Sequence, residues 1–349
     1  MSLFMRALML VLLGLVVLFL VWPAPFRAVA WQPDRLQVPP ENHALQAAVL
    51  WAQGQIIGPE DVEIDASGHV YAGLADGRIV RVEGDHVETI ARTGGRPLGL
   101  VLDGRGHLVV CDAYRGLLQV DLSGQVRVLT DRADGVPFGF TDDLDRAADG
   151  KIYFTDASWR WSQRDYLLDM LEGRPYGRLL VYDPATKTTR TLLKDLYFAN
   201  GVAVMPDGQS VLVAETWRYR ITRYWLKGTH AGQHEVFADN LPGMPDNIDV
   251  DSQGHVWVAL PTPRRPDIDF LARHTWLRER MAVLPRFMWP GPSHQGWVLE
   301  LDSKGHTLRS LQDPSGNHLR FITSAHRRHG QLVLGSLEND RIGVLNLTP

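Results

Sequence analysis

The sequence has very little cysteine and no large excess of charge of either sign, and both features limit what the chain can be. Its 349 residues include one cysteine, Cys111, so no intramolecular disulfide can form. The formal net charge is only −4, and no excess of basic residues favours a nucleic-acid partner. The fold must therefore be held by packing, with or without a metal ion. The length suits one large β domain or two ordinary domains.

Long hydrophobic runs are also scarce, and the exception lies at the N-terminus. Residues Ala7 to Trp22 are apolar without interruption and follow Arg6. As a helix they span about 24 Å, slightly short of a ~30 Å hydrocarbon core, and residues 3–5 lengthen the span if Arg6 snorkels. We predict a signal-anchor or transmembrane helix over residues 1–23 that contacts the lipid bilayer through residues 7–22. The flanking positive charge predicts a single-pass membrane protein whose N-terminus stays in the cytoplasm and whose remainder is exported to the periplasmic or extracytoplasmic side.

A cleaved signal peptide is the alternative interpretation of this segment. Ala28-Val-Ala30 is a small-x-small cleavage pattern. The apolar run is long for a signal peptide, however, and Pro23, Pro25 and Arg27 separate it from that pattern. The sequence therefore favours an uncleaved anchor, followed by a linker over residues 24–45.

After the linker, one pattern recurs six times. An apolar strand enters from a polar corner, ends in a glycine turn and returns as a second strand, as in Asn200-Gly-Val-Ala-Val-Met-Pro-Asp-Gly208 followed by Val211-Leu-Val-Ala214. Spacings near forty residues, with two longer ones, are typical of four-stranded propeller blades with insertions. The copies open at Glu60, Leu98, Asp142, Asn200, Asp246 and Ile322.

These repeats predict an all-β chain whose residues 46–349 form a six-bladed β-propeller. A β-sandwich also has short strands and glycine turns, but it would not repeat one strand pair six times. Two insertions interrupt the repeat. Residues 159–175 contain a short helical pattern, and residues 263–292 carry a basic, amphipathic helical pattern that predicts a short helical insertion in blade 5. The second insertion is expected to pack on the blade, cap the channel or contact lipid.

In a propeller the first strand of each blade lines a central channel, so the opening residues of the repeats meet around one axis. Four openings carry an oxygen ligand, Glu60, Asp142, Asn200 and Asp246, with Asn247 beside the last, and two carry Leu98 and Ile322. Carboxylate and amide oxygens without cysteine or a clear histidine suit a hard cation, and Ca²⁺ accepts such irregular oxygen sets better than Mg²⁺. The alternative is that each residue only caps a turn. Their shared position in the repeat favours a Ca²⁺ site.

The motifs resemble the family of strictosidine synthase-like and adipocyte plasma membrane-associated proteins over residues 40–347. The likeness is carried by Gly58-Pro-Glu-Asp61, Gly95-Arg-Pro-Leu-Gly99, Asp149-Gly-Lys-Ile-Tyr-Phe-Thr-Asp156, Gly177-Arg-Leu-Leu-Val-Tyr-Asp-Pro184, Phe198-Ala-Asn-Gly201, Glu215-Thr216, Arg220-Ile-Thr-Arg-Tyr-Trp225 and Leu241-Pro-Gly-Met-Pro-Asp-Asn-Ile248. More distantly the chain is similar to the gluconolactonase, regucalcin and paraoxonase hydrolases.

That resemblance implies a central Ca²⁺ bound by Glu60, Asn200 and Asp246, with Asn247 as a further ligand. Asp142 stands where those hydrolases usually have asparagine. Two catalytic features of the relatives are missing, because a paraoxonase-type histidine would fall near Leu98 and the strictosidine synthase glutamate near residues 322–324. The resemblance therefore argues against true strictosidine synthase activity.

The function expected from these features is a membrane-anchored, Ca²⁺-dependent hydrolase of the arylesterase or lactonase type, acting on a small-molecule ester or lactone. By resemblance Asp246 is the candidate catalytic base, with Asp142 as a second candidate. The alternative is a non-catalytic binding or scaffold propeller whose Ca²⁺ is structural. Six side chains near the top-face loops are candidates for the substrate pocket, although each could instead belong to the core: Arg96, Phe138, Phe140, Tyr153, Trp159 and Phe198.

Overall fold

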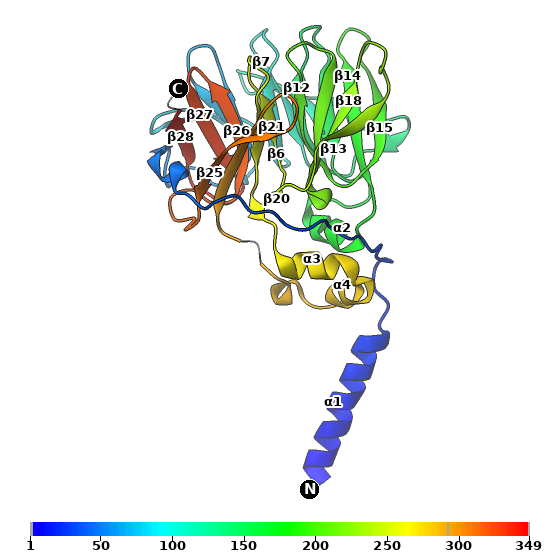
Figure 1. The fold of residues 1–349 in the computed structure, drawn as a ribbon. Coiled ribbons are helices and arrows are strands. Elements are labelled where there is room, and N and C mark those ends of the chain that lie inside the picture. Colours follow the sequence, from blue (N-terminus) through cyan, green and yellow to red (C-terminus); the bar gives the residue numbers. More distant parts are fainter. Residues whose placement is uncertain (1–2, 292, 348–349) are drawn as a thin grey trace.

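The computed structural model describes residues 3–291 and 293–347, and within them six four-stranded antiparallel sheets surround one axis (Figure 1). The predicted six-bladed propeller is confirmed. Blade 1 contains β2 (Val62–Ile64), β3 (Val70–Gly73), β4 (Arg78–Glu83) and β5 (His86–Arg92). Blade 2 contains β6 (Pro97–Leu102), β7 (His107–Asp112), β8 (Gly116–Asp121) and β9 (Val126–Thr130). Blade 3 contains β12 (Thr141–Arg146), β13 (Ile152–Asp156), β14 (Gly177–Asp183) and β15 (Thr188–Leu196).

The remaining three blades complete the circle. Blade 4 contains β16 (Ala199–Val204), β17 (Ser210–Glu215), β18 (Arg220–Trp225) and β19 (His234–Ala238). Blade 5 contains β21 (Ile248–Val250), β22 (Val256–Ala259), β24 (Gly296–Leu301) and β25 (Thr307–Asp313). Blade 6 contains β26 (Ile322–Arg328), β27 (Gln331–Ser336), β28 (Ile342–Asn346) and β1 (Val49–Trp51). Its outermost strand comes from the start of the domain and pairs with β28, so the two ends of the propeller are joined by a shared sheet.

The first strands of the blades form a closed inner ring. Each of β2, β6, β12, β16, β21 and β26 contacts the first strand of the next blade, and β26 returns to β2. Apolar side chains pack between blades, as where Tyr71 and Ile79 of blade 1 meet Leu108 and Val110 of blade 2. Each sheet thereby buries both faces, which one blade alone could not do.

The recurring Asp-x-x-Gly turn has a local physical cause. Asp65 Oδ1 accepts hydrogen bonds from the backbone N–H groups of Ser67 and His69, and Gly68 adopts φ +89°. An aspartate that folds back on its own turn and a glycine at positive φ are the standard chemistry of such corners. The same arrangement recurs at Asp251 and Gly254.

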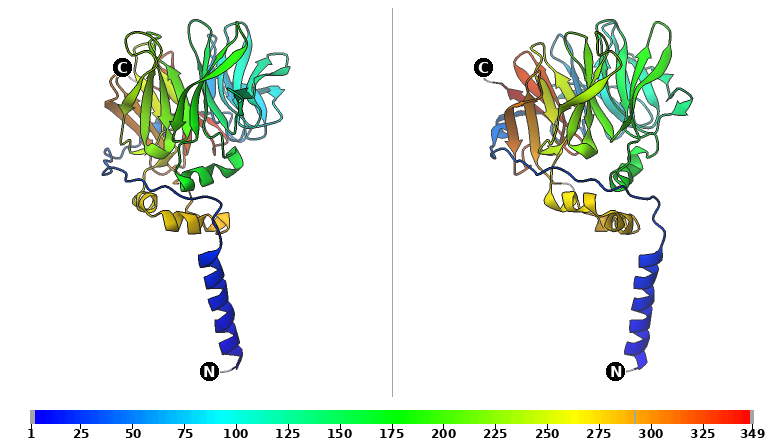
Figure 2. Two further views of the ribbon diagram at one scale, coloured as in Figure 1. Left: turned by 90° about the vertical axis from the view of Figure 1, so that its right-hand side faces the viewer. Right: turned by 45° about the vertical axis from the view of Figure 1, so that its right-hand side comes forward.

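Helices cover one end of the propeller. α2 (Tyr166–Glu172) lies between β13 and β14, whereas α3 (Pro266–Arg273) and α4 (Thr275–Met281) lie between β22 and β24 of blade 5 (Figure 2). The pattern in residues 263–292 is thus divided between two helices. Short 3-10 turns and two small ladders complete the fold: η1 (Ala44–Ala47), η2 (Gln163–Asp165), η3 (Thr216–Arg218), η4 (Arg286–Met288), β10 (Arg132–Ala133) with β11 (Val136–Pro137), and β20 (Gly243–Met244) with β23 (Thr262–Pro263).

The N-terminal helix α1 (Leu3–Val21) projects away from the propeller on the side of α2, α3 and α4 (Figures 1 and 2). By length and composition it is able to cross a membrane. Residues 23–43 contain no helix or strand and run along the helix-covered side of the propeller before η1.

Candidate functional site

A cavity opens at the helix-covered end of the channel, and four of the predicted metal ligands line it. Glu60, Asp142, Asn200 and Asp246 all border this cavity, which encloses about 1000 Å³ including its open mouth. They come from blades 1, 3, 4 and 5. We call these four residues the ring. Leu98 of blade 2 also lines the cavity, and Ile322 of blade 6 is fully buried.

Irregular starts of the first strands aim the ring side chains. The register between β12 and β13 shifts between Thr141 and Leu144, and the register between β16 and β17 shifts between Ala199 and Val202. Such bulges redirect side chains at the rim of a sheet. Gly201 permits close approach of the next blade, because a Cβ there would lie 2.4 Å from the Asp246 carbonyl oxygen. The Asn-Gly pair therefore places an amide beside an acid of the neighbouring blade.

Oxygen atoms of the ring are buried without hydrogen-bond partners. Glu60 Oε2, Asp142 Oδ2 and Asn200 Oδ1 lack a partner, and so does Oδ1 of the adjacent Asn247. Asn247 donates from Nδ2 to Glu60 Oε1 at 3.0 Å, and the side chain of Asn200 hydrogen-bonds to Asp246. Buried oxygens without donors are costly, and several of them facing one cavity require an explanation.

Burial and mutual repulsion oppose ionisation of the ring acids. Burial, followed by the charges of Asp246 and Asp142, raises the pKa of Glu60 well above its usual range. Burial and the charge of Asp246 likewise raise the pKa of Asp142. Burial raises the pKa of Asp246 to about 7. A cation among these groups would relieve both the repulsion and the missing hydrogen bonds.

The donor chemistry of the ring suits a hard cation, although the ring is not a complete coordination site. Among residues 3–291 and 293–347, no three His, Cys, Asp or Glu side chains are arranged so that they could hold a metal ion by themselves. The amide oxygens of Asn200 and Asn247 supply further donors of the kind Ca²⁺ accepts. Glu60, Asp142, Asn200 and Asn247 each have a buried oxygen without a hydrogen-bond partner, and these oxygens are suitable ligands for Ca²⁺.

Acids close in sequence to the three ring acids have different surroundings. Asp61 accepts a hydrogen bond from Leu100 N–H of blade 2 at 3.0 Å, and Asp143 accepts one from Val202 N–H of blade 4 at 2.8 Å. In the same way Asp249 accepts from a backbone N–H of blade 6. We call Asp61, Asp143 and Asp249 the inter-blade carboxylates. Each fastens an odd-numbered blade to the blade that follows it.

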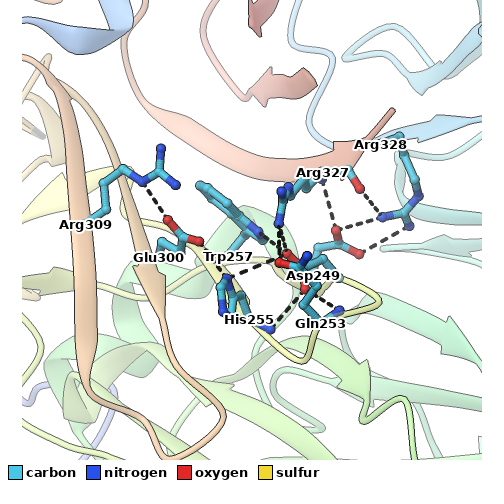
Figure 3. A network of polar contacts seen from close by, with 9 residues as sticks. Asp249, Gln253, His255, Trp257, Glu300, Arg309, Arg327 and Arg328 are labelled. Carbon is cyan, nitrogen blue, oxygen red and sulfur yellow. Dashed lines mark hydrogen bonds and ion pairs between the residues drawn. The ribbon is translucent and has the colours of Figure 1, made fainter. Parts of the chain in front are cut away.

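Cations surround the third inter-blade carboxylate in particular. Figure 3 shows Asp249 beside Arg327 and Arg328; the Arg328 guanidinium contacts both carboxylate oxygens, at 2.9 and 3.2 Å. In the same view His255 contacts Glu300 at 2.8 Å. Charge is therefore compensated in this network, unlike in the ring.

Aromatic side chains form the wall above the ring. Phe140 and Phe198 line the cavity, as two of the pocket predictions required, and their rings meet edge to face at 5.5 Å. Phe198 also packs on Trp217 at 4.6 Å, whose indole N–H donates to Asp169 of α2 at 3.0 Å. Phe198 has φ +59°, a conformation that costs a non-glycine residue ~1–3 kcal/mol and that is found disproportionately at functional sites.

Four other predicted pocket residues do not line this cavity. Phe138 packs against Phe154 at 5.5 Å within blade 3, and Tyr153 lies in the core between blades 3 and 4. Trp159 packs on Tyr176 at the edge of the helices. Arg96 is buried, where its guanidinium donates to the Gly58 carbonyl at 3.0 Å. These four pocket assignments were wrong because successive residues of a strand point to opposite faces of the sheet, so position in the repeat alone does not decide which side chains face the cavity.

Many of the residues that line the cavity were not predicted from the sequence. Phe321 lines the cavity with φ +49° and stands immediately before β26, the place that Phe198 occupies before β16. The repeat openings at Asn200 and Ile322 lie two residues after Phe198 and one residue after Phe321, so the repeat spacing did not pair these two phenylalanines. The other missed residues come from the helices and from loops that meet only in the fold, and they include Tyr166, Met170, Trp217, Met244, Thr262, Arg265, Ile268 and Leu337.

Solved structures define the class of protein to which this architecture belongs. A gluconolactonase from Xanthomonas campestris superimposes with a TM-score of 0.64 at 21% identity, over 94% of this chain and 99% of that one. A calcium-binding regucalcin from Agrobacterium tumefaciens gives a TM-score of 0.62 at 15% identity, over 86% of this chain and 93% of that one. The chain is thus a six-bladed propeller with the fold of gluconolactonases and regucalcins.

Sequence comparison then identifies the family. The chain is 38% identical over 336 residues to adipocyte plasma membrane-associated protein of Salmo salar, covering 88% of this chain and 80% of the relative. It is 35% identical over 336 residues to strictosidine synthase-like protein 6 of Arabidopsis thaliana, covering 93% and 89%. The strictosidine synthase family matches residues 142–229, and the strictosidine synthase-like N-terminal family matches residues 40–82. The chain belongs to the family of adipocyte plasma membrane-associated and strictosidine synthase-like proteins, as its motifs predicted.

Proposed function

We propose that the protein is a membrane-anchored, Ca²⁺-dependent hydrolase of an ester or lactone. The observation that carries this proposal is the meeting of Glu60, Asp142, Asn200 and Asp246 at one cavity whose remaining wall is mainly apolar. Similarity to adipocyte plasma membrane-associated proteins and the apolar helix α1 support the anchoring. The gluconolactonase fold supports a lactonase-like reaction.

Glu60, Asp142, Asn200 and Asp246 are the residues that would hold the ion, with Asn247 Oδ1 as a further donor. A bound Ca²⁺ supplies electrostatic stabilisation for negative charge that develops on a carbonyl oxygen. Asp142 adds a carboxylate where related hydrolases usually carry asparagine. With an ion bound, that extra negative charge would strengthen cation binding or weaken the pull of the ion on a substrate.

The chain's own residues supply the proton transfer and the binding surface. Asp246 lines the cavity and accepts a proton from a water molecule as that water attacks the substrate carbonyl carbon. The new bond is from water oxygen to carbon, the ester C–O bond breaks, and the proton passes from Asp246 to the leaving oxygen. Phe140, Phe198 and Trp217 receive the apolar part of the substrate and exclude water from it.

The test is hydrolysis of an aryl ester and lactone panel by the full chain, with added Ca²⁺ or excess chelator. Asp246→Ala is expected to lower the rate at least ~10²-fold, the usual contribution of a general base. Glu235→Ala, an exposed acid on β19, is the matched control and should keep wild-type activity. Undiminished hydrolysis in excess chelator would refute the proposal.

A non-catalytic propeller with structural Ca²⁺ is the second candidate. It is favoured by the side chains at the remaining positions, because Leu98 borders the cavity and no histidine of the described residues does. In that case chelator lowers the melting temperature while no ester is hydrolysed. A strictosidine synthase condensation is not proposed, since residues 322–324 offer no carboxylate.

A further inference from the structure

We propose that the helices over the cavity form a membrane-docking surface, which rests on the bilayer that α1 enters. The helical layer consists of α2, α3, α4 and η4. This inference concerns an interaction surface and does not depend on the hydrolase activity. The partner is the interfacial zone of a lipid bilayer, where aromatic rings and arginine side chains sit beside lipid headgroups.

Large apolar side chains of the helical layer are exposed. Phe287 of η4 is 87% exposed, and Phe270, Trp276 and Met288 are each more than half exposed. α3 and α4 contact each other, and exposed large apolar side chains on adjoining elements are typical of an interaction surface. Arg273 at the end of α3 is exposed, and its guanidinium has no ion-pair or hydrogen-bond partner among the described residues, so its charge is available to a headgroup.

The end of α1 is fastened directly to this layer. Arg280 of α4 donates from Nη1 to the carbonyl oxygens of Phe19, Leu20 and Trp22 at 2.6, 3.2 and 2.8 Å. Such carbonyls at a helix C-terminus have no partner within their own helix. Arg280 therefore caps α1 and removes any flexible spacer between the anchor and α4.

The chain after α1 is held to the same layer. Val29 N–H donates to the Glu172 carbonyl of α2 at 2.9 Å, and Trp31 N–H donates to the Ala272 carbonyl of α3 at 3.0 Å. Phe26 is buried against Trp161 with ring centroids 6.3 Å apart. A membrane-spanning α1 would consequently place α3, α4 and η4 on the membrane-facing side of the propeller, because the ribbon views show these helices on the side from which α1 projects (Figures 1 and 2).

Docking in this way brings the cavity mouth to the membrane surface. Pro290 and Gly291 line the cavity and follow η4, whose Phe287 and Met288 are exposed. Gln163 of η2, whose neighbour Asp165 pairs with Arg286 of η4, lines the same cavity. An apolar ligand dissolved in the bilayer would therefore reach the ring without crossing bulk water.

The test uses a thiol-reactive fluorophore on the full chain. Cys111 is fully buried, so a cysteine introduced by Phe287→Cys or Trp276→Cys is the reactive thiol. Ser67→Cys, in the exposed turn between β2 and β3, is the matched control. Each labelled chain is reconstituted in phosphatidylcholine vesicles that contain a lipid with a nitroxide near the carbonyl region, and recovery of the chain with floated vesicles shows that it is bound.

Labels at positions 287 and 276 are expected to shift their emission to the blue and to lose most of their fluorescence to the nitroxide lipid, while the label at 67 changes little. Arg280→Ala should reduce quenching at position 287 without reducing flotation. The proposal is overturned if the label at 287 stays as exposed to water as the label at 67. It is equally overturned if that label is shielded without lipid quenching, which indicates a second copy of the chain, or if the chain does not float.

Discussion

The three ring acids and the inter-blade carboxylates come from the same three blades but differ in what their oxygen atoms contact. Asp143 accepts backbone hydrogen bonds on both oxygens, from Val202 at 2.8 Å and Leu144 at 2.8 Å. Its neighbour Asp142 has an oxygen with no partner, and so does Glu60. Both kinds of acid are buried. Burial alone therefore does not distinguish an acid that holds the blades together from one that is free to bind a ligand.

This difference distinguishes acids that stabilise the fold from acids that are available to bind a ligand. The inter-blade carboxylates satisfy donors that would otherwise be orphaned in the core, so they stabilise the propeller. The ring acids repel one another, and one oxygen of Glu60 and one of Asp142 have no donor, so in the absence of a cation these acids cost stability. Groups retained at such a cost are typical of functional sites.

The largest effect is expected at an inter-blade carboxylate. Asp249→Ala removes the partner of Arg328 and the acceptor of Arg327 N–H, and it should lower the free energy of unfolding by ~3 kcal/mol. Urea unfolding followed by circular dichroism measures the change. Asp249→Asn keeps an acceptor and should lose less, whereas an equal loss in both variants would contradict the role given to the N–H contact. Ca²⁺ affinity should remain near that of the wild type.

The ring should behave in the opposite sense. Glu60→Gln removes one of the repelling charges, so without Ca²⁺ the variant is expected to unfold at a higher temperature than the wild type. In the wild type, free Ca²⁺ at about one hundred times its dissociation constant should add ~2.7 kcal/mol to the free energy of unfolding, and the variant should lose most of this gain. Calorimetry with Ca²⁺ and with chelator measures both terms. A variant that is destabilised in chelator and still fully stabilised by Ca²⁺ would erase the distinction between the two sets.

The stability contributed by the inter-blade carboxylates should depend on pH because His326 pairs with Asp61. Burial works against its charged form, but Asp61 at 2.8 Å and the charge of Asp249 raise the pKa of His326 to about 9. Because this pKa lies above the ordinary value, the ion pair contributes fully below about pH 6.5 and is lost as pH rises through 9. Stability should therefore fall by ~2 kcal/mol between pH 7 and pH 10.

His326→Gln is the matched variant for this pH dependence, since glutamine can donate to Asp61 but does not titrate. Its free energy of unfolding, measured by urea titration at each pH, should decline less steeply than that of the wild type. Identical slopes would show that other groups set the alkaline decline.

The repeats were sufficient to predict the fold and the meeting of the ring. Glu60, Asp142, Asn200 and Asp246 open equivalent strands, and closing six blades around one axis necessarily brings equivalent positions together. The sequence could not predict that Asp142 faces the cavity while Asp143 holds two blades together. Both follow the same turn, and only the register shift between β12 and β13 decides which carboxylate reaches Val202 and which faces the cavity.

The prediction of the aromatic pocket residues was partly wrong for a related reason. Phe138 and Phe140 are two residues apart, yet a bend before β12 turns Phe138 into blade 3 and Phe140 into the cavity. Tyr166 and Met170 reach the cavity because α2 folds back over the channel, a long-range contact that no local pattern encodes. Spacing in a repeat predicts position around the axis, whereas the direction of each side chain depends on bulges and on packing between distant segments.

The smallest expected effect concerns Glu63, whose surroundings are intermediate between those of the two sets. It is half-buried and accepts one hydrogen bond, from Leu102 N–H at 3.2 Å, and burial raises its pKa to about 7. A folded-state pKa above the ordinary value means that ionising Glu63 costs stability as pH rises from about 4.5 through 7. Glu63→Gln keeps an acceptor without the charge, so it should stabilise the chain by ~1 kcal/mol at pH 8 and have almost no effect at pH 5. Glu83→Gln, an exposed acid on β4, should change neither value. If Glu63→Gln instead destabilises at pH 8, a single backbone hydrogen bond is enough to offset the burial of a charge, and the cost assigned to the ring must then come from repulsion between its acids.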